Sequence, residues 1–345
     1  MLLLLAVATA ALSLVWVYVV NLPMAFLDDE YPRWAAKRAL LGSCDTGDVL
    51  ILGDSRAAVA IAPRQIATRV TNLALAGSSS IEAYTVAERA LRCPRLPRRV
   101  ILSLSPIQLT GAGTLWDKSV RYRLLGWPEL KTLLDVSHQA GDYSAFSFED
   151  RDGLPPFLKA LVHGIRFPSL YFNSLVQNGV ILRLKSNEAI LRDVTAARGQ
   201  YFFLPQPFDP SRAFTPEVAM SRIAPPPVLD AYMGRLLDLL EHKGIQVDFV
   251  AMPINASSGG RIGSTVRGDL DRYLRALEQR YPNFHVLGDT LPSWPDPYFN
   301  DTLAHFNTHG TEVFSNRLAA CLDAAGSSAV GLAAIATCRA LLNQP

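Results

Sequence analysis

The sequence predicts an α/β protein built on a doubly wound parallel sheet, preceded by a transmembrane helix and interrupted by a large insertion. Short apolar stretches alternate with helix-length stretches in the first and last thirds of the 345-residue chain, and residues 1–27 carry no charged side chain. Strands that alternate with helices across short loops pair in parallel, because each helix returns the chain to the same edge of the sheet.

The N-terminal segment is predicted to be a transmembrane signal anchor over residues 1–27. Residues 2–20 form an almost unbroken apolar run, close to the roughly 20 residues that a helix needs to cross a bilayer. A cleaved signal peptide is the alternative, but the small-residue site at Ala8 and Ala10 lies inside the apolar run.

The charges around this segment leave its orientation open. Arg33, Lys37 and Arg38 follow the apolar run and no basic residue precedes it, which by the positive-inside rule places the body in the cytoplasm. The cysteine count favours the opposite, extracytoplasmic side, and we adopt that side as the expectation, with the chain a single-pass protein of the inner or plasma membrane.

The four cysteines are an even number, which fits two disulfides in an oxidising compartment. Cys44 and Cys93 each lie shortly before a predicted strand, and in a parallel sheet those positions share one edge. Cys321 and Cys338 flank a short C-terminal segment. We therefore predict the disulfides Cys44–Cys93 and Cys321–Cys338, with four buried free thiols as the alternative.

The α/β domain is expected to span residues 45–325, followed by a C-terminal segment, 326–345. Apolar runs predict its strands at residues 48–53, 70–75, 99–104, 246–252 and 284–287. Helices are predicted at residues 63–69, 80–91, 228–243, 266–280 and 310–323.

Residues 110–227 are rich in aromatic side chains and proline, and strands and helices do not alternate there. We therefore interpret them as an insertion that covers the crevice or faces a membrane partner. The alternative is that its aromatic side chains build a small core of their own.

The motif Gly53-Asp54-Ser55-Arg56 follows the first predicted strand directly. Loops at the carboxyl ends of parallel strands line the binding crevice, which exposes Ser55 to a substrate, and the turn leaves the amide of Ser55 or Arg56 free to donate to an oxyanion. The alternative is that Asp54 and Ser55 only cap the next helix.

A second motif, residues 301–310, lies between the last strand and the last helix and contains Asp301, His305 and His309. A serine hydroxyl needs a base, and a histidine oriented by a carboxylate supplies it. A surface histidine in a helix-entry loop is the alternative. His305 and His309 lack further ligands nearby in the sequence, so we predict neither a metal nor a cofactor.

Together these motifs resemble the SGNH, or GDSL-like, hydrolase superfamily, which has a flavodoxin-like three-layer fold. Gly53-Asp54-Ser55-Arg56, the run Asn72 to Ser79, and His305-Phe306-Asn307 followed by Gly310 are most similar to an extracytoplasmic branch. That branch includes the teichoic-acid D-alanylation protein and the alginate and cellulose O-acetylation proteins. The resemblance covers about residues 48–107 and 245–323.

The resemblance implies that Ser55 is the nucleophile, that the Ser55 and Gly77 amides belong to the oxyanion hole, and that His305 is the base oriented by Asp301. Gly77 has a turn-forming role as its alternative. Asp301 precedes His305 by four positions where the family has three, so either a loop bulge restores the contact or a Ser-His dyad operates. Ser105 stands where the hydrolases carry an oxyanion asparagine.

The implied function is a membrane-anchored serine O-acyltransferase that moves an acetyl- or D-alanyl-type group onto a polysaccharide or glycolipid. The resemblance also implies a membrane-bound O-acyltransferase as partner. An esterase acting on the same polymer and a non-catalytic assembly subunit are the alternatives. Arg56 is a candidate substrate contact, with an exposed arginine at a helix start as the alternative. With 33 basic and 31 acidic side chains, nothing favours nucleic-acid binding.

Overall fold

The computed structural model describes residues 1–21, 30–146, 180–204, 209, 214–325 and 332–345. Its centre is a five-stranded sheet whose pairs are all parallel. The strands follow the order β2-β1-β3-β4-β6, with these bounds: β1 (Val49–Gly53), β2 (Val70–Asn72), β3 (Arg99–Ser103), β4 (Gln246–Phe249) and β6 (Phe284–Val286). The protein therefore has an α/β fold on a parallel sheet, as the sequence predicts.

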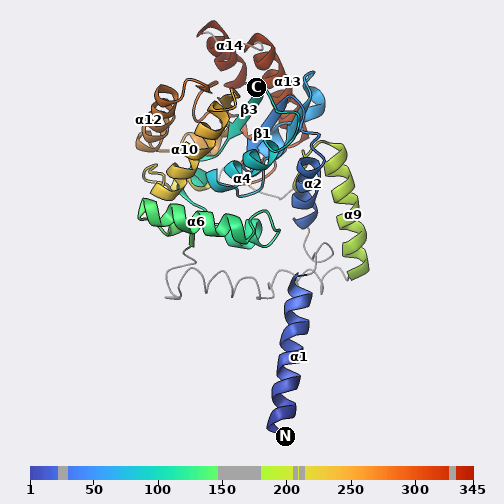
Figure 1. Cartoon of the computed structure of the whole chain (residues 1–345). Helices are drawn as coiled ribbons and strands as arrows, with labels where there is room; N and C mark the ends of the chain where they lie inside the picture. The colour runs from blue at the N-terminus through green and yellow to red at the C-terminus, as the bar shows by residue number, and fades with distance from the viewer. Residues whose placement is uncertain (22–29, 147–179, 205–208, 210–213, 326–331) are drawn as a thin grey trace.

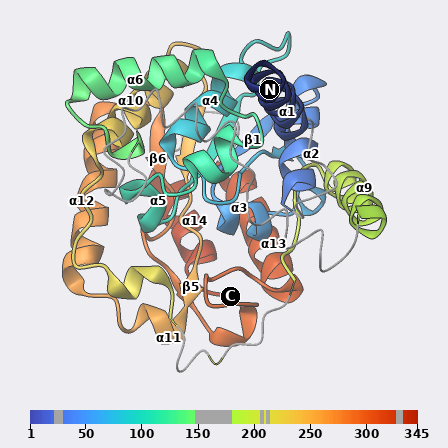
Figure 2. The same ribbon diagram turned by 90° about the horizontal axis from the view of Figure 1, so that it is seen from below.

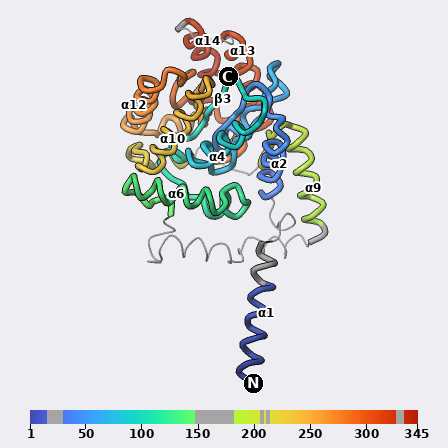
Figure 3. The backbone as a smooth tube through the Cα atoms, in the orientation of Figure 1, coloured from blue at the N-terminus to red at the C-terminus, as the bar shows by residue number. Residues whose placement is uncertain are grey.

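Helices cover both faces of the sheet, which explains why the strands are continuous apolar runs. All five residues of β1 and of β3 are buried. Figure 2 shows α4 (Ser80–Ala90) and α10 (Pro227–Glu241) on one side of the strands, with α13 (Thr308–Ala325) and α14 (Leu332–Leu342) on the other. The tube in Figure 3 gives the chain path between these layers.

Further elements complete the described part of the chain (Figure 1). They are α1 (Leu2–Asn21), α2 (Tyr31–Gly42), α3 (Ser55–Ala60), α5 (Pro106–Thr110), α6 (Trp127–Ala140), α9 (Val180–Ala196), α11 (Ala256–Gly259) and α12 (Ser264–Arg280), with a small parallel sheet of β5 (Ile254–Asn255) and β7 (Ser293–Trp294). The described residues contain no helix that is both long and apolar enough to cross a membrane.

The helix after β1 differs from the sequence prediction. We predicted it at residues 63–69, but α3 begins at Ser55, and only Pro63–Gln65 forms a short 3₁₀ turn further on. The Asp54 side chain accepts a hydrogen bond from the Arg56 amide at 2.9 Å, so the helix starts with only Asp54 between it and the end of the strand. The capping alternative is therefore correct for Asp54, and Ser55 becomes the first helical residue.

Helix α2 carries two of the charged residues that follow the N-terminal segment into the body of the protein. Only 8% of Arg33 and 3% of Lys37 is exposed, while Trp34 between them is 1% exposed and belongs to the main core. In the sequence these cations served only to predict the orientation of the N-terminal segment. The structure shows that both are buried, which matters for the site described below.

The predicted insertion packs partly around a second small core. Its aromatic members Trp116 and Phe146 are 3% and 4% exposed and lie 5.9 Å apart between ring centroids. Residues from α4, α6, α10 and the segment between them complete this core: Ile81, Leu115, Leu125, Leu130, Leu133, Val136, Ala145, Val228, Leu229 and Tyr232. Trp116 and Phe146 are thus buried in a small core, but they share it with α4 and α10 and the insertion does not build it alone. Phe148, Tyr171 and Phe172 lie outside the described residues.

Both predicted disulfides are confirmed, Cys44–Cys93 and Cys321–Cys338. The first joins the segments that lead into β1 and β3, at the edge of the sheet opposite Ser55. The second joins α13 to α14 and fixes the C-terminal helix on the domain.

We expect the double variant Cys44→Ser/Cys93→Ser to lose about 4 kcal/mol of unfolding free energy, because this bond closes a loop of 49 residues. Cys321→Ser/Cys338→Ser should lose roughly 1 kcal/mol less, since its loop spans 17 residues. Urea unfolding of the full chain in detergent measures both. Equal stability of the wild-type chain and both variants would contradict this expectation.

Candidate active site

Ser55 lies in a turn that is fixed by the neighbouring strand. Gly53 has a φ of +154°, and a β-carbon there would overlap the backbone carbonyl of Ser103 at the end of β3. The other carboxylate oxygen of Asp54 accepts a hydrogen bond from the Ser105 amide at 2.8 Å. Asp54 therefore joins the start of α3 to the loop after β3, and this bond holds the partly exposed Ser55 at the carboxyl edge of the sheet.

A serine, a histidine and an aspartate form a continuous series of hydrogen bonds at this edge. His305 Nε2 lies 2.8 Å from Ser55 Oγ, and His305 Nδ1 lies 2.6 Å from Asp301 Oδ2. Ionised Asp301 can only accept, so the Nδ1 proton is directed to it and Nε2 is left to accept the Ser55 proton. The structure thus brings together the three residues that the two sequence motifs nominate.

The loop from Phe299 to Phe306 explains how Asp301 reaches His305 despite the extra residue between them. Its ends form an antiparallel bridge, and the Asn300 amide donates to the His305 carbonyl at 2.8 Å. Ala304 adopts a left-handed conformation with a φ of +63°, which non-glycine residues rarely adopt. The Asp301–His305 contact is therefore made within this loop, whose turn includes the left-handed Ala304.

Asp301 is also held by backbone amides. Its Oδ1 accepts hydrogen bonds from the Leu303 amide at 2.9 Å and the His305 amide at 3.2 Å. Burial acts to raise the pKa of Asp301, but the hydrogen bonds and charge of His305, with the Leu303 amide, outweigh it and lower the pKa below its ordinary 3.8.

This shift predicts a pH dependence of stability. A carboxylate with a lowered folded-state pKa stabilises the fold above pH 3.8, and this contribution is lost as pH falls through the folded value. We expect the unfolding free energies of the wild-type chain and Asp301→Asn to converge as pH is lowered from 6 towards about 3. Urea unfolding across this range measures it, and a difference that stays constant with pH would contradict it.

The loop after β2 lies against the turn that carries Ser55. The Gly53 carbonyl accepts hydrogen bonds from the Leu75 amide at 2.8 Å and from Ser78 Oγ at 2.5 Å. Gly77 has a φ of +77°, and a β-carbon on it would overlap the Thr114 side chain. Within the described part of the chain the Ser55 and Gly77 amides make no hydrogen bond, which leaves both able to donate to an oxyanion.

Ser105 and Arg56 have different surroundings from those that their candidate roles require. The Ser105 amide is already bonded to Asp54, so only its hydroxyl can serve as a donor to substrate. Arg56 is buried: its Nη2 lies 2.9 Å from Glu217 Oε2, and its Nε donates to the Leu303 carbonyl at 2.9 Å. The alternative of an exposed arginine at the helix start is wrong, and the Arg56 donors named here bond within the protein, where they link α3 to Glu217 and to the loop that carries His305.

Three residues near the triad were not identified from the sequence. Phe203 packs on the His305 ring at 4.5 Å between centroids with an interplanar angle of 37°. Arg33 and Lys37, one helical turn apart on α2, lie against Phe203 and its neighbour Tyr201. The available signal was two cations four positions apart on a helix with a buried apolar side; Phe203 had no signal of its own.

His309 stacks on Tyr298 at 5.2 Å between ring centroids and does not join the triad. In the described ranges, no group of three or more histidine, cysteine or acidic side chains is arranged to hold a metal ion.

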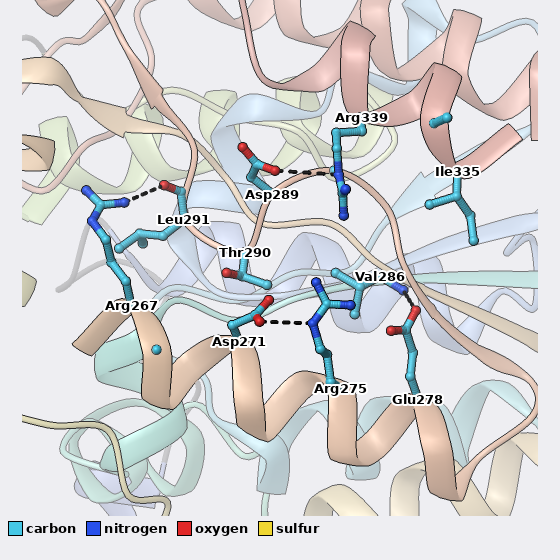
Figure 4. Close-up of a pocket in the computed structure, with 13 residues that line it drawn as sticks. Arg267, Asp271, Arg275, Glu278, Val286, Asp289, Thr290, Leu291, Ile335 and Arg339 are labelled. Carbon is cyan, nitrogen blue, oxygen red and sulfur yellow. Dashed lines mark hydrogen bonds and ion pairs between the residues drawn. The ribbon is translucent and has the colours of Figure 1, made fainter. Parts of the chain in front are cut away.

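A cleft of about 760 Å³ lies between α12 and α14 (Figure 4), and its lining does not include Ser55, His305 or Asp301. Two ion pairs lie in it: Arg275 Nε lies 2.9 Å from Asp271, and Arg339 Nε lies 3.6 Å from Asp289. Its other two charged side chains bond to the backbone: Arg267 donates to the Leu291 and Gly259 carbonyls, and Glu278 accepts a hydrogen bond from the Val286 amide.

Comparison of the chain with models of known protein families, with characterised proteins and with solved structures gave no match.

Proposed function

We propose that this chain is a serine O-acyltransferase of the SGNH type that works through an acyl-enzyme on Ser55. The observation that carries the proposal is the hydrogen-bonded series Ser55–His305–Asp301 at the carboxyl edge of a parallel sheet. A nucleophile bonded to a base, with the base oriented by a third group, is the arrangement that covalent acyl transfer requires. The strand order and the helices on both faces also support the three-layer SGNH fold.

In the first half-reaction, Ser55 Oγ attacks the acyl carbon of the donor and its proton passes to His305 Nε2. The oxyanion that forms accepts hydrogen bonds from the Ser55 and Gly77 amides. His305 then protonates the leaving group, and the acyl group remains as an ester on Ser55. In the second half-reaction, His305 takes the proton of an acceptor hydroxyl, which attacks the ester carbon. The bond from the acyl carbon to Ser55 Oγ breaks, and His305 returns the proton to Ser55 Oγ.

Two features favour this function over its alternatives. Asp301 Oδ2 lies 2.6 Å from His305 Nδ1. A lack of contact between these two residues would have favoured a non-catalytic subunit, so this contact favours the enzyme. Phe203 covers one side of the His305 ring, and covering of the base helps to exclude water, which favours transfer over hydrolysis.

The setting of the reaction belongs to the same proposal. Two disulfides support an oxidising, extracytoplasmic compartment. The uncharged residues 1–27 support a membrane anchor, and the described side chains of α1, from Leu2 to Val15, are exposed. A polysaccharide or glycolipid acceptor and a membrane-bound O-acyltransferase that supplies the acyl group follow from the family resemblance.

The test uses the full chain in detergent. We expect a fluorophosphonate probe to label wild-type protein on Ser55 and not to label Ser55→Ala. With 4-nitrophenyl acetate as donor and soluble oligosaccharides as acceptors, mass spectrometry should find acetylated oligosaccharide. Release of acetate alone, with labelled Ser55, would support the esterase instead. Absence of both labelling and turnover would leave the assembly subunit.

A further inference from the structure

Helix α2 presents two buried cations to the region of the triad. The Arg33 guanidinium carbon lies 5.1 Å from the centre of the Tyr201 ring and 5.0 Å from that of the Phe203 ring. Lys37 Nζ lies 4.9 Å from the Tyr201 ring. Because the same Phe203 packs on His305, the guanidinium and the catalytic base both contact one aromatic ring.

These two cations have no counter-ion among the described residues. Neither Arg33 nor Lys37 forms an ion pair with a described residue. Within the described residues, only Lys37 of the two donates a side-chain hydrogen bond, to the Ala74 carbonyl. The charges of Glu30 and Asp54 affect the pKa of Tyr201, but both carboxylates already have other partners. Glu30 pairs with Lys118 at 2.9 Å, and Asp54 accepts hydrogen bonds from the Arg56 and Ser105 amides.

Two adjacent buried cations without an anion are costly, since each has lost water and repels the other. The pKa of Lys37 reflects this: burial, reinforced by the charge of Arg33, lowers it well below its ordinary value. The same burial cost applies to the Arg33 guanidinium. An anion bound between the two side chains would remove it.

The geometry also leaves these side chains free to act. Stacking on two rings orients the Arg33 guanidinium without using its N–H donors, and those donors match the oxygens of a carboxylate or phosphate. Lys37 bonds to Ala74, in the loop that leads to Gly77. The pair is thus connected to the site through two segments, the loop before Gly77 and the Phe203 ring that packs on His305.

We infer that Arg33 and Lys37 form a subsite for an anionic group, a carboxylate or phosphate, on the substrate of Ser55. The inference rests on the proposed acyl transfer, because it takes the bound anion to be part of the substrate. It makes Arg33 a specificity residue, which selects charged over neutral esters, and gives Phe203 the role of holding both the cation and His305.

The test compares three esters with the full chain in detergent. 4-Nitrophenyl acetate is neutral, 4-acetoxybenzoate carries a carboxylate on the alcohol side, and 4-nitrophenyl hemisuccinate carries one on the acyl side. Because an acceptor enters where the alcohol leaves, the second ester also reports on an anionic acceptor. The measured quantity is kcat/KM for a charged ester divided by kcat/KM for the neutral ester. We expect Arg33→Gln to lower this ratio by at least about tenfold for one of the charged esters. Arg33→Lys should restore part of the lost ratio.

Arg38→Gln is the matched control, since Arg38 lies on the same helix but over Tyr31 and partly exposed. It should leave all three kcat/KM values unchanged. Ratios within twofold of the wild-type ratios in Arg33→Gln, for both charged esters, would overturn the inference and leave Arg33 as a packing residue.

A binding measurement separates failure of this subsite from failure of the proposed function. The Ser55→Ala chain cannot form the ester, so 4-acetoxybenzoate and 4-nitrophenyl hemisuccinate act on it only as ligands. We expect one of them to raise its thermal midpoint and expect the shift to disappear in Ser55→Ala/Arg33→Gln. No shift in Ser55→Ala, or equal shifts in both chains, would overturn the subsite even if wild-type protein proves catalytic.

Discussion

Replacing Ser55 with alanine is expected to reduce ester turnover and acyl transfer by about 10³-fold or more, because the residual rate relies on binding and oxyanion donors alone. His305→Ala should cause a loss of similar size, since its Nε2 is the acceptor bonded to Ser55 Oγ. Asp301→Asn should lose less than either, because it removes the orienting charge but keeps the base. Steady-state kinetics with 4-nitrophenyl acetate measures all three.

The double variant Ser55→Ala/His305→Ala distinguishes a shared mechanism from separate roles. Residues that act as one unit are not additive, so the double variant should be about as slow as the slower single variant. Ser221→Ala is the control, since Ser221 is exposed and remote from the triad in sequence. A double variant slower than either single variant by their multiplied factors would contradict the shared mechanism.

The second large effect is expected at the buried ion pair of Arg56 and Glu217, whose side chains are 6% and 0% exposed. Glu217→Gln leaves the Arg56 charge buried without its partner, and removal of one member of such a pair costs roughly 3–5 kcal/mol. Burial acts to raise the pKa of Glu217, but Arg56 outweighs it and lowers that pKa, so the pair is charged in the folded chain. Urea unfolding measures the loss.

The paired variant Arg56→Met/Glu217→Leu separates stability from catalysis. It removes both charges and should recover most of the unfolding free energy. Activity should stay low, because the Leu303 carbonyl loses the Arg56 Nε donor that holds the loop of Asp301 and His305. Asp271→Asn, which breaks the exposed pair with Arg275, should have little effect on either measurement. Full recovery of activity in the paired variant would show that Arg56 does not position the loop.

The sequence by itself determined the sheet, because buried parallel strands need continuous apolar runs. The runs around Ile51 and Ile101 sit in β1 and β3, as predicted. It also located Ser55 and His305, since loops at the carboxyl ends of strands converge in such a sheet. The start of the helix after the first strand was predicted less well. Proline and polar residues indicated residue 63, but the Asp54 cap places the start eight residues earlier.

Only the tertiary structure decided how the site is built around those two residues. The contact of Asp301 with His305 depends on the left-handed backbone of Ala304. The residue types of this loop do not predict that conformation. The burial of Arg56 depends on Glu217, 161 positions away, and Arg33 meets Phe203 across a similar separation. Such contacts are set by packing between distant segments, and periodicity along the chain records only which side of an element is buried, not what lies against it.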